Sequence, residues 1–238
     1  MLLNLRVFLF ITFVSLPLIA ETPFEAPDAI VQHYCVATQA QQQTLNGASM
    51  EVDISGALPK LKKQGRLHAL RRISSLGRIT YEALRFDGDN TVKREVIARY
   101  LTAEAESQRN QAVSLAVTPD NYKFKFKGEH ELDGRPAYLF EVSPKKKAPG
   151  YFKGQLWIDA ATHLRVQESG RLVKSPSILI KKVAFVRKYE IRDGISVPLQ
   201  VQSVVDTRLV GKAELTIDFS NFSIDSPKRD ALGDSESQ

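Results

Sequence analysis

The chain has 238 residues, of which 43% are apolar and 25% charged, an ordinary composition for a globular protein. Its formal net charge of +6 is spread through strand-like and loop-like stretches instead of being gathered on one helix, which argues against a nucleic-acid partner. The single cysteine, Cys35, excludes an internal disulfide and reads as a small buried apolar residue on a helix.

Residues 1–20 have the pattern of a cleaved signal peptide. Arg6 supplies a positive start, and an apolar run from Val7 to Ile19 follows before Ala20. This run is shorter than the roughly 20 residues that cross a bilayer as a helix. An uncleaved anchor is the alternative. Export without disulfides favours a bacterial periplasm, and we expect one domain over 21–226 and a disordered tail over 227–238.

Two regions have helical features. The first begins at Asp28, a plausible N-cap, and stops at Asn46-Gly47, with Gln32, Gln39 and Gln41 to Gln43 on its polar side. The second is Val92 to Asn110, which reads either as the end of a strand or as a helix over Tyr100–Gln108, the helix being favoured. Asp87-Gly88-Asp89-Asn90 before it predicts a turn rather than a calcium loop.

About ten stretches read as strands, most of them by a period of two. They are 50–55, 58–74, 78–86, 122–127, 135–142, 155–159, 164–173, 178–191, 195–206 and 213–219. Asp-Gly turns such as Asp133-Gly134 and Asp193-Gly194 join neighbours, which indicates an antiparallel meander. A sheet this wide with one apolar face must split, close or curl, with one or two helices filling its inner side.

No catalytic or metal motif emerges from the residues. The four histidines, His33, His68, His130 and His163, lie on separate predicted elements, and we expect no metal site and no cofactor. Glu141, Asp159 and Glu168 could converge as an acid–base pair, but exposed charges on the wet face are the preferred interpretation. Lys145 to Lys147 predicts a solvated hairpin loop, with a docking patch for an acidic partner or anionic lipid as the alternative.

Three segments carry a family resemblance: GRPAYLFEVSPKKK, the Leu156-Trp157-Ile158-Asp159 strand, and DGISVPLQVQSVVDTRLVGKAELTIDFSNF. With the preceding helix and strands, they resemble the outer-membrane lipoprotein-sorting (LolA/LolB-like) superfamily, whose fold also occurs in the lipid-sensing domain of a periplasmic sigma-factor regulator. The resemblance implies an α+β, mainly antiparallel, strongly curved unclosed half-barrel with helices covering its concave face. In the carriers of this family a single arginine on an early strand helps to hold the lid; Arg66, Arg71, Arg72 and Arg78 all lie in that region, and the role is assigned to none of them.

The resulting hypothesis is a monomeric periplasmic carrier that shields acyl chains of a lipid or lipoprotein in transit between envelope membranes, with membrane-anchored donor and acceptor proteins as further partners. Such a cavity needs no polar motif, since each buried methylene contributes about 0.8 kcal/mol. The expected cavity residues are Phe124, Phe126, Phe140, Leu156, Ile158, Phe185, Val201 and Ile217. A non-enzymatic envelope interaction or sensor protein with a packed core and no lipid cargo is the alternative, and the sequence supports no enzymatic activity.

Overall fold

The computed structural model describes residues 25–109, 115–175 and 178–224. The predicted signal peptide over 1–20 and the predicted tail over 227–238 lie outside the described residues. Within the described ranges, none of the helices has both the length and the apolar character needed to cross a bilayer.

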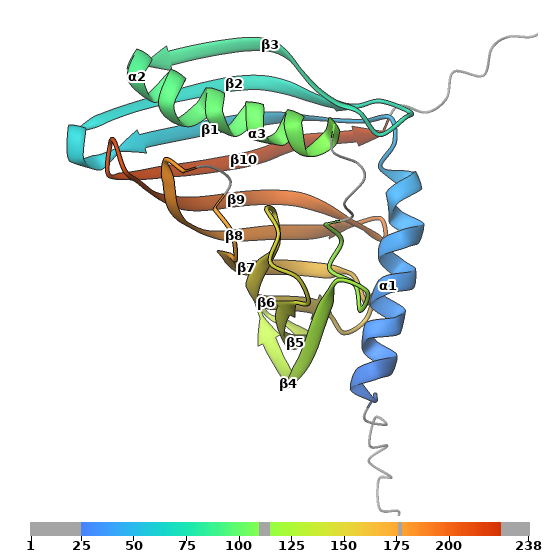
Figure 1. Cartoon of the computed structure of the whole chain (residues 1–238). Helices are drawn as coiled ribbons and strands as arrows, with labels where there is room; N and C mark the ends of the chain where they lie inside the picture. The colour runs from blue at the N-terminus through green and yellow to red at the C-terminus, as the bar shows by residue number, and fades with distance from the viewer. Residues whose placement is uncertain (1–24, 110–114, 176–177, 225–238) are drawn as a thin grey trace, which may run out of the picture.

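One antiparallel sheet of ten strands dominates the structure, in the order β3-β2-β1-β10-β9-β8-β7-β6-β5-β4 (Figure 1). The strands are β1 Ala48–Leu58, β2 Lys63–Ile73, β3 Ile79–Gly88, β4 Tyr122–Leu132, β5 Arg135–Pro144, β6 Phe152–Asp159, β7 Arg165–Leu172, β8 Ile180–Arg192, β9 Ile195–Thr207 and β10 Lys212–Ile224. The first and last strands pair with each other, and β3 and β4 are left as open edges. The predicted mainly antiparallel, unclosed and curved sheet of about ten strands is therefore confirmed.

A glycine pair brings strands β6 and β7 unusually close. Gly154 lies opposite Gly170, and a Cβ added at Gly154 would sit 1.9 Å from the carbonyl oxygen of Ser169. It would also sit 2.5 Å from the Cα of Gly170. Because these are backbone atoms, a side chain here could be accommodated only by moving a strand.

We therefore expect Gly154→Ala to lower the free energy of unfolding by about 2 kcal/mol, the cost of overpacking. Lys153→Ala on the same strand is the control, because Lys153 is exposed and its truncation should stay within about 0.5 kcal/mol of the parent. Urea unfolding of both variants measures the difference. Equal losses would show that the β6–β7 approach is not tight in solution.

Both helical regions pack on the same face of the sheet. Helix α1 (Pro27–Thr44) runs across the strand ends from β9 towards β4, and α3 (Ala98–Arg109) lies along β1, β2 and β10 (Figure 1). A helical turn, α2 (Asn90–Val92), and a π-helical segment, η2 (Lys93–Ile97), lead into α3 without a break; the 3-10 turn η1 (Pro59–Leu61) joins β1 to β2.

The second helix was predicted over Tyr100–Gln108, which places its start too late. The alternative prediction, that this region is the end of a strand, was wrong. The helix begins at Asn90 because Asp89 caps it: the Asp89 carboxylate accepts a hydrogen bond from the Thr91 backbone N–H at 2.7 Å. The acidic turn that precedes it is thus also a helix start.

The buried apolar residues form two separate cores. The α1-side core joins Ile30, Val31 and Tyr34 of the helix to β4–β6 and β8. The α3-side core joins Val92, Val96 and Ile97 to β1, β2 and β10. We call the sheet face under α1 and α3 the covered face. Its middle, over β7, β8 and β9, lies between these cores.

Gln41 was predicted on the polar side of α1, and this was wrong. It is only 8% exposed and exchanges two hydrogen bonds of 2.9 Å with the backbone N–H and C=O of Ser196 on β9. By contrast, Gln39 on the same helix is exposed. Gln41 therefore anchors the end of α1 to the sheet.

Truncation by Gln41→Ala should cost about 2 kcal/mol, because both Ser196 backbone groups lose their side-chain partner in a buried place. Gln39→Ala on the same helix should stay within about 0.5 kcal/mol of the parent. Thermal unfolding compares the two variants, and a Gln41→Ala value as small as that of Gln39→Ala would contradict the anchor.

Candidate functional site

One row of side chains crosses all ten strands on the covered face. Residues directly opposite in neighbouring antiparallel strands point to the same face. In strand order from β4 to β3, the row is Phe126, Phe140, Leu156, Glu168, Arg187, Val201, Ile217, Ile54, Leu67 and Phe86. Eight positions are apolar, and a glutamate beside an arginine interrupts them at β7 and β8.

All eight predicted cavity residues share this face, since Phe124, Ile158 and Phe185 lie two positions from members of the row. Phe140, Leu156, Ile158, Phe185 and Ile217 are buried inside the two cores. Phe124, Phe126 and Val201 are partly buried and pack against them. Their shared face is thus established, and their role as a ligand-binding surface stays a prediction.

The interruption is a charged cluster. The Glu168 carboxylate accepts a hydrogen bond from the guanidinium of Arg165 at 3.4 Å and from that of Arg187 at 3.3 Å. The Tyr189 hydroxyl donates to the same carboxylate at 3.3 Å. Among the described residues, Glu168 is the only acid paired with either arginine. Two cations therefore share one anion.

The two arginines border open space, whereas Glu168 does not. The side chain of Glu168 is 2% exposed, against 30% for Arg165 and 43% for Arg187. The Arg165 guanidinium lies 4.5 Å from the centre of the Tyr189 ring, and that of Arg187 lies 4.5 Å from the centre of the Phe185 ring. Each guanidinium thus stacks on an aromatic ring, and part of each arginine side chain stays accessible.

The electrostatics keep both guanidinium groups charged. Burial alone would lower the pKa of Arg165, but the Tyr189 oxygen and the Glu168 carboxylate raise it above its ordinary value. The same opposing effects leave the pKa of Arg187 raised. The cluster therefore carries one positive charge in excess of its carboxylate.

Tyrosines from both covering helices lie within the field of this cluster. Burial raises the pKa of Tyr34 on α1, and the charge of Arg165 opposes that effect. Burial likewise raises the pKa of Tyr100 on α3; Glu104 adds to that effect, and Arg71 and then Arg187 oppose it. Both tyrosines are therefore uncharged at neutral pH.

Glu141, Asp159 and Glu168 were predicted to be exposed charges on the solvent-facing side of the sheet, and this was correct only for Glu141. Glu141 lies at the surface and pairs with Lys127 at 3.1 Å. Asp159 is 5% exposed and binds its own turn, and Glu168 is buried in the cluster, so neither is a charge on a wet face. Each has separate partners, which does not support the acid–base pair.

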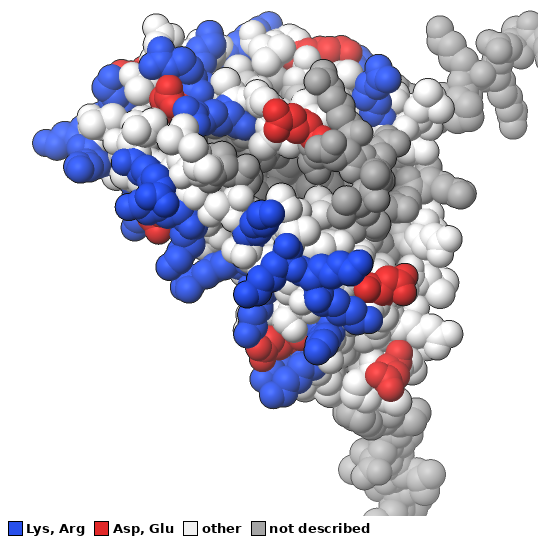
Figure 2. Space-filling view, in the orientation of Figure 1, with Lys and Arg blue, Asp and Glu red and all other residues white. Residues whose placement is uncertain are grey.

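Basic side chains also gather outside the covered face. Lys145 to Lys147 are exposed in the loop between β5 and β6, as the solvated-loop interpretation predicted. Figure 2 shows Lys and Arg grouped near the lower end of the molecule and along the left-hand strand ends. Such groups favour contact with anionic surfaces.

No family model matches the chain, and no curated protein sequence matches it. Among solved structures, it is similar to a LolA superfamily protein from Nitrosomonas europaea, with 10% identity over 82% of this chain and 94% of that chain and a TM-score of 0.38. An outer membrane lipoprotein-sorting protein domain from Vibrio parahaemolyticus matches with 11% identity over 85% and 93%, and a TM-score of 0.42. A DUF1329 family protein from Desulfovibrio piger matches with 16% identity over 85% and 95%, and a TM-score of 0.39. The superfamily that the sequence resembles is thus among the matched structures, as a likeness of fold.

Of the four arginines left open by the sequence, Arg71 contacts a covering helix. Its guanidinium donates to Glu104 of α3 at 3.3 Å, and the Tyr81 hydroxyl donates to the same carboxylate. The Arg71 side chain is largely buried. Arg71 and Tyr81 therefore hold α3 to strands β2 and β3.

Proposed function

We propose that this protein binds an anionic amphiphile with an acyl chain on its covered face and carries it within the bacterial envelope. The observation that supports this most is the pair of partly exposed arginines sharing one buried carboxylate. An anionic head group such as a carboxylate or phosphate would supply the second partner.

Apolar side chains continue from the cluster along β8 and β9. Val183 lies opposite Val205, and Val201 lies beside Arg187 in the row; all three valines are partly exposed. An acyl chain over this strip would leave water at about 0.8 kcal/mol per methylene. The strip offers a place for the tail directly beside the proposed place for the head group.

The envelope location is part of the proposal. The predicted signal peptide and the absence of a disulfide pair in the sequence favour the periplasm. The exposed basic side chains, including Lys145 to Lys147, would draw the protein to anionic membrane surfaces, where it could take up or release its ligand.

The test is direct extraction of ligand from the exported protein. The full chain is produced with export, purified without detergent, extracted with organic solvent and examined by lipid mass spectrometry. We expect an anionic acyl compound near one equivalent per chain. A clean extract, together with no uptake of a fluorescent fatty acid, would overturn the carrier function.

The second candidate is an envelope interaction or sensor protein without lipid cargo. Burial favours it, because five of the eight predicted cavity residues are closed within the cores. For such a protein the charged cluster would be only a structural element. The same extraction separates the two functions, since the interaction protein yields no bound lipid.

A further inference from the structure

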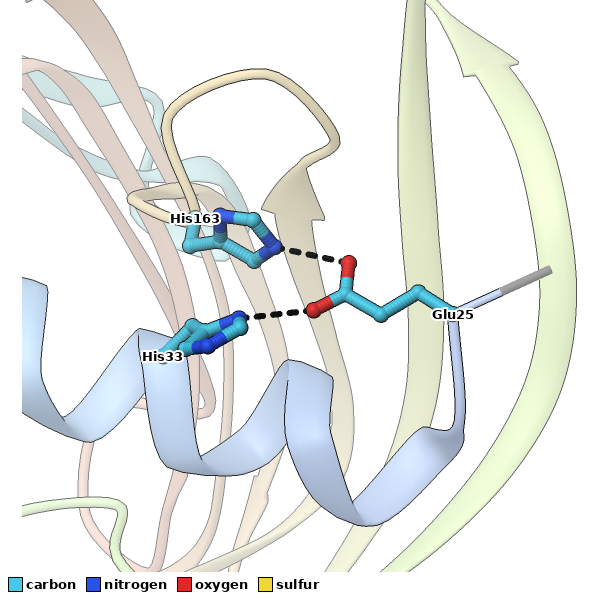
Figure 3. Close-up of side chains that lie close together, drawn as sticks. All are labelled: Glu25, His33 and His163. Carbon is cyan, nitrogen blue, oxygen red and sulfur yellow. Dashed lines mark hydrogen bonds and ion pairs between the residues drawn. The ribbon is translucent and has the colours of Figure 1, made fainter. Parts of the chain in front are cut away.

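Two of the four histidines, predicted to be scattered, come together at the start of α1. The His33 Nδ1 atom lies 2.7 Å from Oε1 of Glu25, and the His163 Nε2 atom lies 2.9 Å from Oε2 of the same carboxylate. Figure 3 shows the carboxylate facing both imidazoles, with His33 on the helix and His163 on the loop between two strands. Sequence separation hid this grouping, since 138 positions divide Glu25 from His163.

We propose that Glu25, His33 and His163 form a binding site for a divalent transition-metal ion, Zn²⁺ being the best fit. Their three ligand atoms lie within 4.8 Å of one another. Two imidazole nitrogens and one carboxylate oxygen are a donor set that suits zinc, which binds nitrogen and oxygen at about 2.0–2.2 Å. Ligands at that distance stand roughly 3.4 Å apart in a tetrahedron, so modest side-chain movement closes the set.

The surrounding structure holds the ligands in advance. Asp159 fixes the turn before His163: its carboxylate accepts hydrogen bonds from the backbone N–H of Ala161 at 3.2 Å and of Thr162 at 2.8 Å. His163 itself has a φ of 56°, a conformation that this turn imposes. The rings of His33 and His163 meet edge to face, with centroids 4.9 Å apart.

A cleft with polar residues in its lining opens beside the Glu25 carboxylate. This cleft of about 660 Å³ adjoins the group and is lined by Glu25, Glu129, Tyr138 and Asp159 among others. The Tyr138 hydroxyl donates to the Glu25 carboxylate at 3.4 Å, which orients that ligand. A water molecule or a small anion in the cleft would complete the tetrahedron.

The geometry also fixes what the ion would do. Glu25 precedes α1, His33 lies within it and His163 belongs to the turn between β6 and β7. An ion held by all three would tie the first turns of the covering helix to the sheet. This site is independent of the amphiphile proposed for the covered face.

The test uses the full chain, purified without a histidine tag and stripped with a chelator. Titration with Zn²⁺ by calorimetry should show one equivalent bound, and Co²⁺ should give the intense visible absorption of a tetrahedral site. His33→Ala and His163→Ala should each weaken Zn²⁺ binding roughly 100-fold, the loss of one ligand among three. His130→Ala, which removes an exposed histidine of β4, should bind like the parent.

A stability measurement keeps the test decisive if a variant is less stable without metal. Zn²⁺ at a concentration that just saturates the parent should raise the Tm of the parent and of His130→Ala, and it should raise the Tm of His163→Ala much less. The metal site would be overturned if the parent did not bind one equivalent of Zn²⁺, or if the parent and the three variants bound Zn²⁺ with equal affinity. Glu25, His33 and His163 would then be only a hydrogen-bonded group that joins α1 to the sheet.

Discussion

Replacing Glu168 with glutamine is expected to lower the free energy of unfolding by about 3 kcal/mol. The substitution keeps the size of the side chain and an acceptor for the Tyr189 hydroxyl. It removes the one negative charge that Arg165 and Arg187 share on the covered face. Two like charges then face each other without an anion, in a place where Glu168 itself is 2% exposed. Urea unfolding at neutral pH measures the loss.

The matched control is Glu141→Gln. Glu141 also sits on a strand and pairs with one base, Lys127, but both side chains are at the surface. Surface pairs contribute little, so this change should cost less than about 1 kcal/mol. If the two variants lost the same stability, the buried cluster would not be an energetic feature of the fold.

The cluster marks the limit of what strand patterns predict. The alternation along β8 correctly places Arg187 on the same side as Phe185 and Tyr189. In β7, by contrast, Gln167, Glu168 and Ser169 are all polar, so the period of two gives no inner face. Glu168 is buried because the register sets it opposite Arg187, and a register between strands cannot be read from one strand. One feature of the sequence could have indicated the buried acid: Arg187 lies on an apolar strand face, and a charge in such a place requires a buried partner.

Helix α1 shows the same limit for single residues. Its apolar positions Ile30, Val31 and Tyr34 follow helical spacing and are buried as that spacing indicates. Gln41 was interpreted as a surface residue, and His33 was interpreted as separate from the other histidines, because a sequence-based assignment rests on polarity and spacing alone. Their partners, Ser196 and Glu25, come from other elements, so only the assembled fold reveals them. The architecture was thus predictable from repeated patterns, and the polar sites were not.

Neutralising Arg187 should remove the selectivity of the protein for an anionic head group. The probes are palmitate and the uncharged alcohol of the same chain length, each displacing a bound fluorescent fatty acid from the full chain. The parent should prefer palmitate, because Arg187 and Arg165 have one carboxylate between them. A hydrogen bond to a charged group contributes about 1.5–3 kcal/mol, so Arg187→Gln should weaken palmitate binding roughly 10- to 100-fold. Binding of the alcohol should change little.

Glu168→Gln, in the same cluster, should change palmitate affinity in the opposite direction to Arg187→Gln. With the internal carboxylate gone, both arginines are free for the ligand, and palmitate should bind more tightly than to the parent. Palmitate should also restore part of the lost stability, since it binds the folded state and replaces the missing anion. Equal affinities for acid and alcohol in the parent would end the head-group assignment while leaving an apolar site. In the parent, a ligand carboxylate that adds a second anion to the cluster would explain why an apolar face carries two arginines and a single acid.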